Sequence, residues 1–123
     1  MKALLLVFVG GGLGSTLRYL IGKFLNAPDM SFPWGTFLVN IIGSFLVGLA
    51  FGWLLEKNKF TDDLMFFLVV GFCGGFTTFS AFAHESLTFL RYGYFNLFAI
   101  YVLTSLVVGL FCVWLGYALI KFI

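Results

Sequence analysis

Uncharged polar residues recur every four positions in two strongly apolar stretches of the sequence. In the first stretch they are Thr36, Asn40, Ser44 and the small residue Gly48, and in the second Tyr101, Ser105 and Gly109, beside Thr104. Side chains four positions apart lie along one face of a helix, with a slow drift around its axis. Hydroxyl and amide groups can donate hydrogen bonds to an anion without trapping it by a positive charge. Two such faces could line a narrow polar channel, although Asn40 alone is equally compatible with a hydrogen bond between helices.

A glycine- and threonine-rich segment interrupts a third apolar stretch. Residues 71–82 read GFCGGFTTFSAF, in which Gly74 and Gly75 are followed by Thr77 and Thr78. These residue types weaken a helix, and irregular backbone at membrane depth is tolerated only where protein, water or an ion satisfies it. Carbonyl groups exposed at such breaks coordinate small cations in several transporter folds. We therefore expect this helix to be broken near its middle.

Two phenylalanines follow the expected break. Phe79 and Phe82 are three positions apart, on one helix face. An aromatic ring has a positive edge and a negative face, so ring edges directed into a pore could attract a small anion without binding it tightly. Core packing or lipid contact is the more common role of such a pair, and the spacing alone leaves both interpretations open.

Two charged residues lie inside or near apolar stretches. Arg18 either reaches the headgroups or holds a polar structure in place, because an unpaired charge inside a membrane is costly. Glu85 could be a proton-coupled transport carboxylate, an ion-pair partner or a residue solvated at the interface. Coupling is the least favoured of these, since no second acid lies inside the membrane. His84 is the only histidine and indicates no metal site.

The composition is that of an integral membrane protein. Of 123 residues, 62% are hydrophobic and 10% are charged, whereas soluble domains carry about 25% charged residues. A membrane span needs about 20 apolar residues, so the chain has room for four spans in a single all-α domain, residues 1–123. The net charge of +2 is too small and scattered to suggest nucleic acid.

We expect the spans at residues 3–22, 33–55, 64–90 and 95–120. Thr61 and the two acids after it resemble a helix N-terminus. The apolar start at residues 2–8 imitates a signal peptide, but no typical cleavage site follows, so we interpret it as part of the first span. Gly10 with Gly14, and Gly11 with Ser15, form pairs of small residues that suit close helix crossing.

The basic residues give a weak orientation signal. Four spans place both termini on one side. The cations expected on that side are Lys2, Lys57, Lys59 and Lys121, and those expected opposite are Lys23 and Arg91, joined by Arg18 if it reaches the headgroups. So small a bias allows insertion in both orientations, while a single orientation with the termini inside stays open. Cys73 and Cys112 fall in apolar stretches and are expected to be free thiols.

Taken together, these residues resemble the Fluc/CrcB family of small fluoride channels. The motifs are GGGLGSTLRY at residues 10–19, GTFLVNIIGSF at 35–45, GFCGGFTTFSAFAHE at 71–85, and Tyr101 with Ser105 in the last span. The resemblance covers the whole chain and shows no departure at these positions.

The resemblance implies an antiparallel, dual-topology homodimer in a bacterial inner membrane, with two fluoride pores and a structural sodium ion at the dimer interface. It implies a passive, selective fluoride channel that is not an enzyme, with fluoride, membrane lipid and a second copy of the chain as partners. The implied pore residues are Asn40, Phe79 and Phe82, with hydroxyls from Thr36, Tyr101 and Ser105. Gly74 and Thr77 would offer backbone carbonyls to sodium, and Arg18 and Glu85 would be polar supports.

Two other functions are compatible with four small spans. A proton-coupled exporter of the small multidrug type also uses four helices and dual orientation, but that class relies on an acid in its first span. This first span contains Arg18 and no acid. A non-conducting membrane assembly is the second alternative, and it predicts no ion flux in any lipid.

Overall fold

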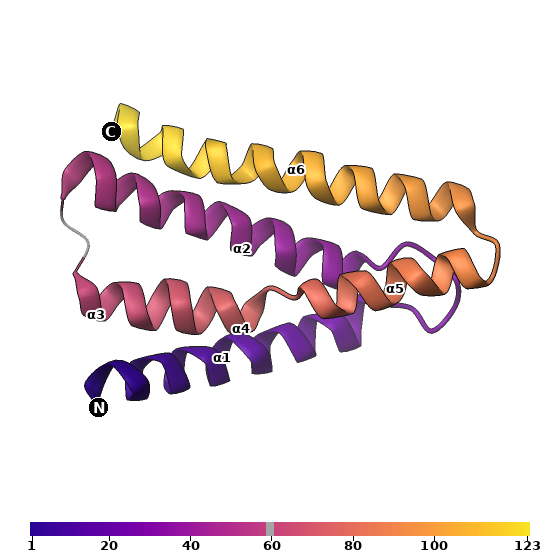
Figure 1. The fold of residues 1–123 in the computed structure, drawn as a ribbon, viewed down its shortest axis with the longest axis horizontal. Helices are drawn as coiled ribbons and strands as arrows, with labels where there is room; N and C mark the ends of the chain where they lie inside the picture. The colour runs from indigo at the N-terminus through magenta and orange to yellow at the C-terminus, as the bar shows by residue number, and fades with distance from the viewer. Residues whose placement is uncertain (59–60) are drawn as a thin grey trace.

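The computed structural model describes residues 1–58 and 61–123, and Lys59, which entered the count of basic residues, lies outside them. Helical rods lie side by side (Figure 1). They comprise α1 (Lys2–Leu25), α2 (Trp34–Gly52) continued by η1 (Trp53–Lys57), a third rod of α3 (Asp62–Leu64), η2 (Met65–Cys73), α4 (Gly74–Phe76) and α5 (Phe79–Arg91), and α6 (Phe95–Phe122). Within the described residues, four helical stretches are long and apolar enough to cross a membrane, which confirms the predicted all-α spans.

Both termini lie at one end of the molecule (Figure 1). At that end the Lys2 ammonium pairs with Asp63, and the Tyr117 hydroxyl donates to Glu56. Thr61 caps α3, because its side-chain oxygen accepts the Leu64 N–H at 3.3 Å. The predicted helix start at Thr61 is therefore confirmed.

Glycines let α1 pack directly against the third rod. A Cβ atom added at Gly10 would lie 2.2 Å from the Phe67 carbonyl oxygen, and one added at Gly14 would lie 2.2 Å from the Phe72 carbonyl oxygen. Both distances are far below van der Waals contact, so a side chain at either position would force the two backbones apart. The predicted role of Gly10 and Gly14 in close crossing is confirmed.

Glycines also bring α2 and α6 into close contact. A Cβ at Gly48 would lie 2.2 Å from the Val113 carbonyl oxygen, and one at Gly116 would lie 2.4 Å from that of Phe45. Gly48 therefore packs against α6. Four residues turn a helix by about 400°, so each step of the stripe drifts by about 40°. Over three steps the drift that we expected reaches about 120° between Thr36 and Gly48.

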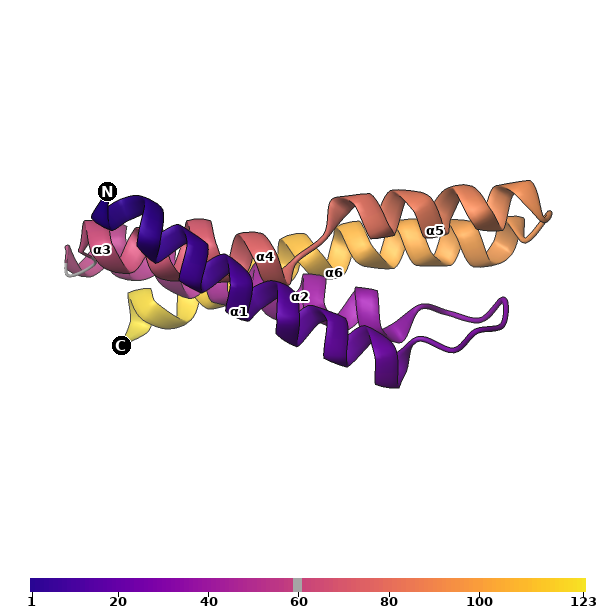
Figure 2. The ribbon, with the colours of Figure 1, turned by 90° about the horizontal axis from the view of Figure 1, so that it is seen from below.

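Two consecutive residues with extended backbone separate α4 from α5. The ψ angle is 157° at Thr77 and 113° at Thr78. Beyond this point α5 runs beside α6 and is set off from the line of α4 (Figure 2). Cys73 and Cys112, both within the described residues, are free thiols as expected.

Candidate functional site

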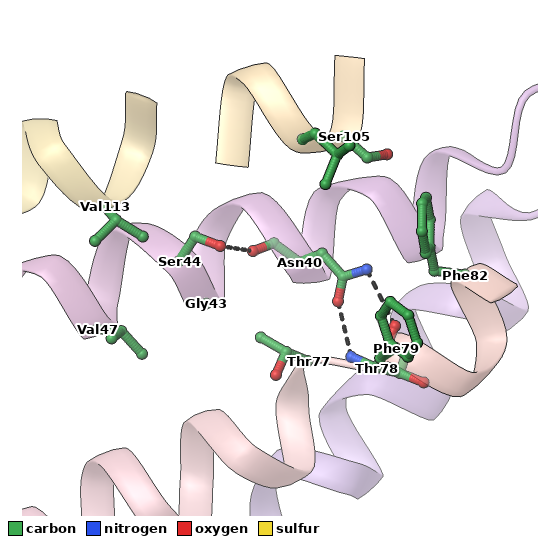
Figure 3. Close-up of a pocket in the computed structure, with 11 residues that line it drawn as sticks. Asn40, Gly43, Ser44, Val47, Thr77, Thr78, Phe79, Phe82, Ser105 and Val113 are labelled. Carbon is green, nitrogen blue, oxygen red and sulfur yellow. Dashed lines mark hydrogen bonds between the residues drawn. The ribbon is translucent and has the colours of Figure 1, made fainter. Parts of the chain in front are cut away.

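The backbone between α4 and α5 is held by the side chain of Asn40 on α2. The Thr78 N–H, which would reach the Gly74 carbonyl in a continuous helix, donates instead to Asn40 Oδ1 at 2.7 Å. Asn40 Nδ2 donates in return to the Thr78 carbonyl at 3.2 Å (Figure 3). The Thr78 hydroxyl oxygen accepts the Ala81 N–H at 3.1 Å and so caps α5. The amide of Asn40 thus satisfies both backbone groups of Thr78.

Arg18 on α1 satisfies another carbonyl next to this segment. Its Nε donates to the Gly75 carbonyl at 2.9 Å, and the Ser15 hydroxyl approaches the same oxygen at 3.4 Å. In a continuous helix this carbonyl would accept the N–H of Phe79. Of the two alternatives for Arg18, the structure selects the second, because the guanidinium supports a polar backbone segment.

A hollow of about 340 Å³ lies between α2, α6 and the Thr77–Thr78 segment. Its polar lining is neutral. The residues that line it include Asn40, Ser44, Thr77, Thr78, Phe79, Phe82 and Ser105 (Figure 3). The hollow therefore unites four of the predicted pore residues, Asn40, Phe79, Phe82 and Ser105, with the threonines that follow α4.

Most of the polar groups around this hollow already have partners. The Ser44 hydroxyl donates to the Asn40 carbonyl at 2.7 Å, and the Thr77 hydroxyl donates to the Cys73 carbonyl at 2.8 Å. The exception, within the part of the chain that the structure describes, is Ser105, whose buried hydroxyl has no hydrogen-bond partner. A buried hydroxyl without a partner is costly, and Ser105 is one of the residues that line the hollow.

A second hollow, of about 210 Å³, is lined by the charged residues Arg18, Lys23 and Glu85. Thr36 and Thr78 also line it, so the two hollows share Thr78. The Thr36 hydroxyl donates to Glu85 Oε1 at 2.6 Å, and the Tyr101 hydroxyl donates to Glu85 Oε2 at 2.6 Å. Glu85 is therefore held by two neutral hydroxyls. The salt bridge found among the described residues joins Lys2 and Asp63 and does not involve Glu85.

Aromatic rings pack beside the first hollow and the Glu85 carboxylate. Tyr101 is fully buried, and its ring centre lies 5.1 Å from that of Phe82 and 5.4 Å from that of Phe32. The rings of Phe79 and Phe82 lie 5.9 Å apart and are tilted by 44°. Phe79 is 79% exposed in the single chain. The aromatic pair thus stands beside the polar groups, with Phe79 at the open side of the first hollow.

Gly74 and Thr77, the residues expected to bind sodium, differ in their surroundings. Gly74 is exposed, and the nearest atom to a Cβ added there is 3.9 Å away. Thr77 lines the first hollow. The described residues contain no cluster of three or more histidine, cysteine or carboxylate side chains that could hold a metal.

Asn26, which was not among the residues expected at the site, lies at the C-cap of α1. Its Oδ1 accepts the N–H groups of Gly35 at 2.7 Å and Thr36 at 3.3 Å, and its Nδ2 donates to Thr36 Oγ1 at 3.2 Å. The available signal was an amide side chain directly after a helix and two positions before Pro28. That signal predicts a turn, and it does not reveal the contact with α2.

Comparison with known proteins gives one family over almost the whole chain. A family profile described as CrcB-like protein, Camphor Resistance (CrcB), matches residues 5–117. A protein of Bacteroides fragilis named fluoride-specific ion channel FluC is 45% identical over 120 residues, 94% of each chain. Proteins of the same name are 46% identical in Phocaeicola vulgatus, over 94% of this chain and 96% of that one, and 44% identical in Gloeothece citriformis, over 98% of both.

These matches confirm the resemblance drawn from the four motifs. With four helices able to span a membrane among its described residues, the chain is a multi-pass integral membrane protein. It belongs to the CrcB (FluC) family, a family of ion channels and not of enzymes.

Proposed function

We propose that this protein is a fluoride-selective channel that lets fluoride leave the cell passively, down its electrochemical gradient. The relatives named fluoride-specific ion channels support the choice of ion. The observation that carries the proposal is the unpartnered hydroxyl of Ser105, buried beside a hollow whose other polar groups are neutral. Such a hydroxyl is a free donor for a small anion.

A fluoride ion must give up its hydration shell to cross the membrane. Moving an isolated ion out of water into a low-dielectric medium costs tens of kcal/mol. A path for fluoride must therefore replace water with donors, yet bind weakly enough for the ion to leave. Ser105 and the positive ring edges of Phe79 and Phe82 meet both requirements, because none of them is charged.

The remaining predicted residues have supporting or secondary roles in this proposal. Asn40 holds the Thr77–Thr78 segment open beside the path and orients it. Thr36 lines the second hollow, and its hydroxyl and that of the buried Tyr101 both donate to Glu85. Arg18 supports the Gly75 carbonyl.

We further propose an antiparallel homodimer with two pores in a bacterial inner membrane. In a two-fold assembly an off-axis feature occurs twice and an on-axis feature once, so a pore through the first hollow of each chain would occur twice. The single chain leaves large apolar side chains of α1 and α6 exposed, among them Phe8, Leu13, Leu103 and Leu110. Such faces suit lipid or a second copy.

A structural sodium ion on the dimer axis completes the proposal. Gly74 and Thr77 of each copy would hold it, so two copies would offer four carbonyls. The Gly74 carbonyl suits a small cation because the Thr78 N–H, its usual helical donor, is directed at Asn40 instead. When bound, the ion would supply positive charge that holds the two Thr77–Thr78 segments together.

Fluoride efflux from liposomes tests the proposed function. Vesicles that contain the purified protein should release fluoride rapidly and chloride hardly at all, as measured with ion-selective electrodes. Equal release of the two halides would overturn the proposal. Efflux that follows an imposed pH gradient would favour the proton-coupled exporter, and absence of any flux would favour a non-conducting assembly.

The proposed dual topology has its own test. Single cysteines introduced in the turn at Gly93, in a background without Cys73 and Cys112, should be labelled by an impermeant reagent from both sides of the membrane. Labelling from one side alone would contradict the antiparallel dimer.

A further inference from the structure

Asn26 connects the loop after α1 to the groups that hold Glu85. The residue is half-buried and ends α1, where its backbone N–H donates to the Gly22 carbonyl at 2.9 Å. Its side chain makes three hydrogen bonds to the first turn of α2, two through Oδ1 and one through Nδ2. It also lines the second hollow together with Thr36 and Glu85.

The donors and acceptors fix the direction of this hydrogen-bond chain. Backbone N–H groups of Gly35 and Thr36 can only donate, so the oxygen of the Asn26 amide must face them and the NH₂ group must face Thr36 Oγ1. A hydroxyl has one proton. Because Asn26 donates to the Thr36 oxygen, the Thr36 proton remains directed at Glu85 Oε1, 2.6 Å away.

Close packing holds the Asn26 amide in this position. A Cβ added at Gly35 would lie 2.8 Å from Asn26 Oδ1 and 2.9 Å from the Cα of Gly22. Glycines at positions 22 and 35 thus bring the end of α1 and the start of α2 close enough for the amide to bridge them. The bridge is built by two helices and does not depend on the loop alone.

We propose that Asn26 is a positioning residue of the permeation path: it directs the Thr36 hydroxyl, and through it the Glu85 carboxylate, beside the second hollow. The inference rests on the proposed fluoride conduction. It assigns to Asn26 two separable roles, because the amide oxygen caps α2 while the amide nitrogen orients the hydroxyl.

Asn26→Asp separates the two roles. A carboxylate keeps both backbone hydrogen bonds. Its charge is favoured by the N-terminus of α2 and disfavoured by the C-terminus of α1, which Asn26 ends, so the variant should assemble and its melting temperature should change little. It cannot donate to Thr36, and fluoride efflux should fall by about five- to tenfold, the effect of one hydrogen bond. Asn96→Asp is the matched control, because it changes an exposed asparagine in the first turn of α6 and should conduct like the wild type.

A double-mutant cycle distinguishes orientation from simple charge repulsion. In the Thr36→Ser background the hydroxyl remains, so Asn26→Asp should still reduce efflux. In the Thr36→Val background the hydroxyl is gone, so Asn26→Asp should have no further effect on the residual efflux. A new negative charge that merely repels fluoride would act equally in both backgrounds.

The inference is overturned if Asn26→Asp conducts like the wild type, if it lowers efflux equally in all backgrounds, or if it fails to assemble, since the cap it retains should suffice for folding. Failure of the proposed function is seen separately, because the wild type itself would then release no fluoride.

Discussion

The contact between α1 and the third rod allows a prediction with a magnitude taken from the structure. In Gly14→Ala the new carbon would lie 2.2 Å from the Phe72 carbonyl oxygen, and it must move away by about 0.8 Å to reach 3.0 Å, below which such contacts are essentially never found. The obstacle is backbone, so the helices themselves must separate. Overpacking of this kind costs about 1–3 kcal/mol, and we expect the upper end of that range.

The same separation should impair conduction. α1 carries Arg18, which donates to the Gly75 carbonyl at 2.9 Å, and a shift of the helix lengthens this bond. We therefore expect Gly14→Ala to lower both the free energy of unfolding and the rate of fluoride efflux. Equilibrium unfolding in mixed detergent and SDS, followed by circular dichroism, measures the first. The liposome assay measures the second.

Gly11→Ala is the matched control on the same helix. Its added carbon would lie 3.7 Å from the Gly71 carbonyl oxygen, an ordinary van der Waals contact. Alanine is favoured over glycine in a helix interior by about 1 kcal/mol, so this variant should be at least as stable as the wild type. If the two variants unfold alike and conduct alike, the argument from backbone contact at Gly14 is refuted.

Three further substitutions test the site. Asn40→Ala removes the partners of both Thr78 backbone groups and should cost about 2–4 kcal/mol in the unfolding assay, whereas Asn96→Ala should cost little; equal costs would contradict the proposed role of the amide. Ser105→Ala removes a hydroxyl without a partner, so efflux should fall while stability is unchanged or rises. If Ser105→Ala lost stability and conducted normally, the hydroxyl would be a structural group and not a donor to fluoride. Phe82→Ile should lower efflux with assembly intact, and unchanged efflux would remove the ring from the mechanism.

The amino-acid sequence determined the features that depend on local composition and spacing. Few charges and four long apolar stretches predict four membrane spans, because hydrocarbon excludes charge over about 20 residues. The Gly10 and Gly14 pair indicated a close helix crossing, and Thr61 indicated the start of α3; the structure has both. The motifs were also sufficient to indicate the family.

Tertiary structure alone decided which polar groups meet. Arg18 could have reached the headgroups, but α1 packs so that its guanidinium faces the Gly75 carbonyl, 57 positions away in sequence. Gly48 continued a four-residue pattern, yet the turn of α2 presents it to α6. The contact of Asn26 with Thr36 depends on how closely the end of α1 packs against the start of α2. Sequence spacing fixes which residues share a helix face, whereas the rotation of each helix against its neighbours fixes what that face touches.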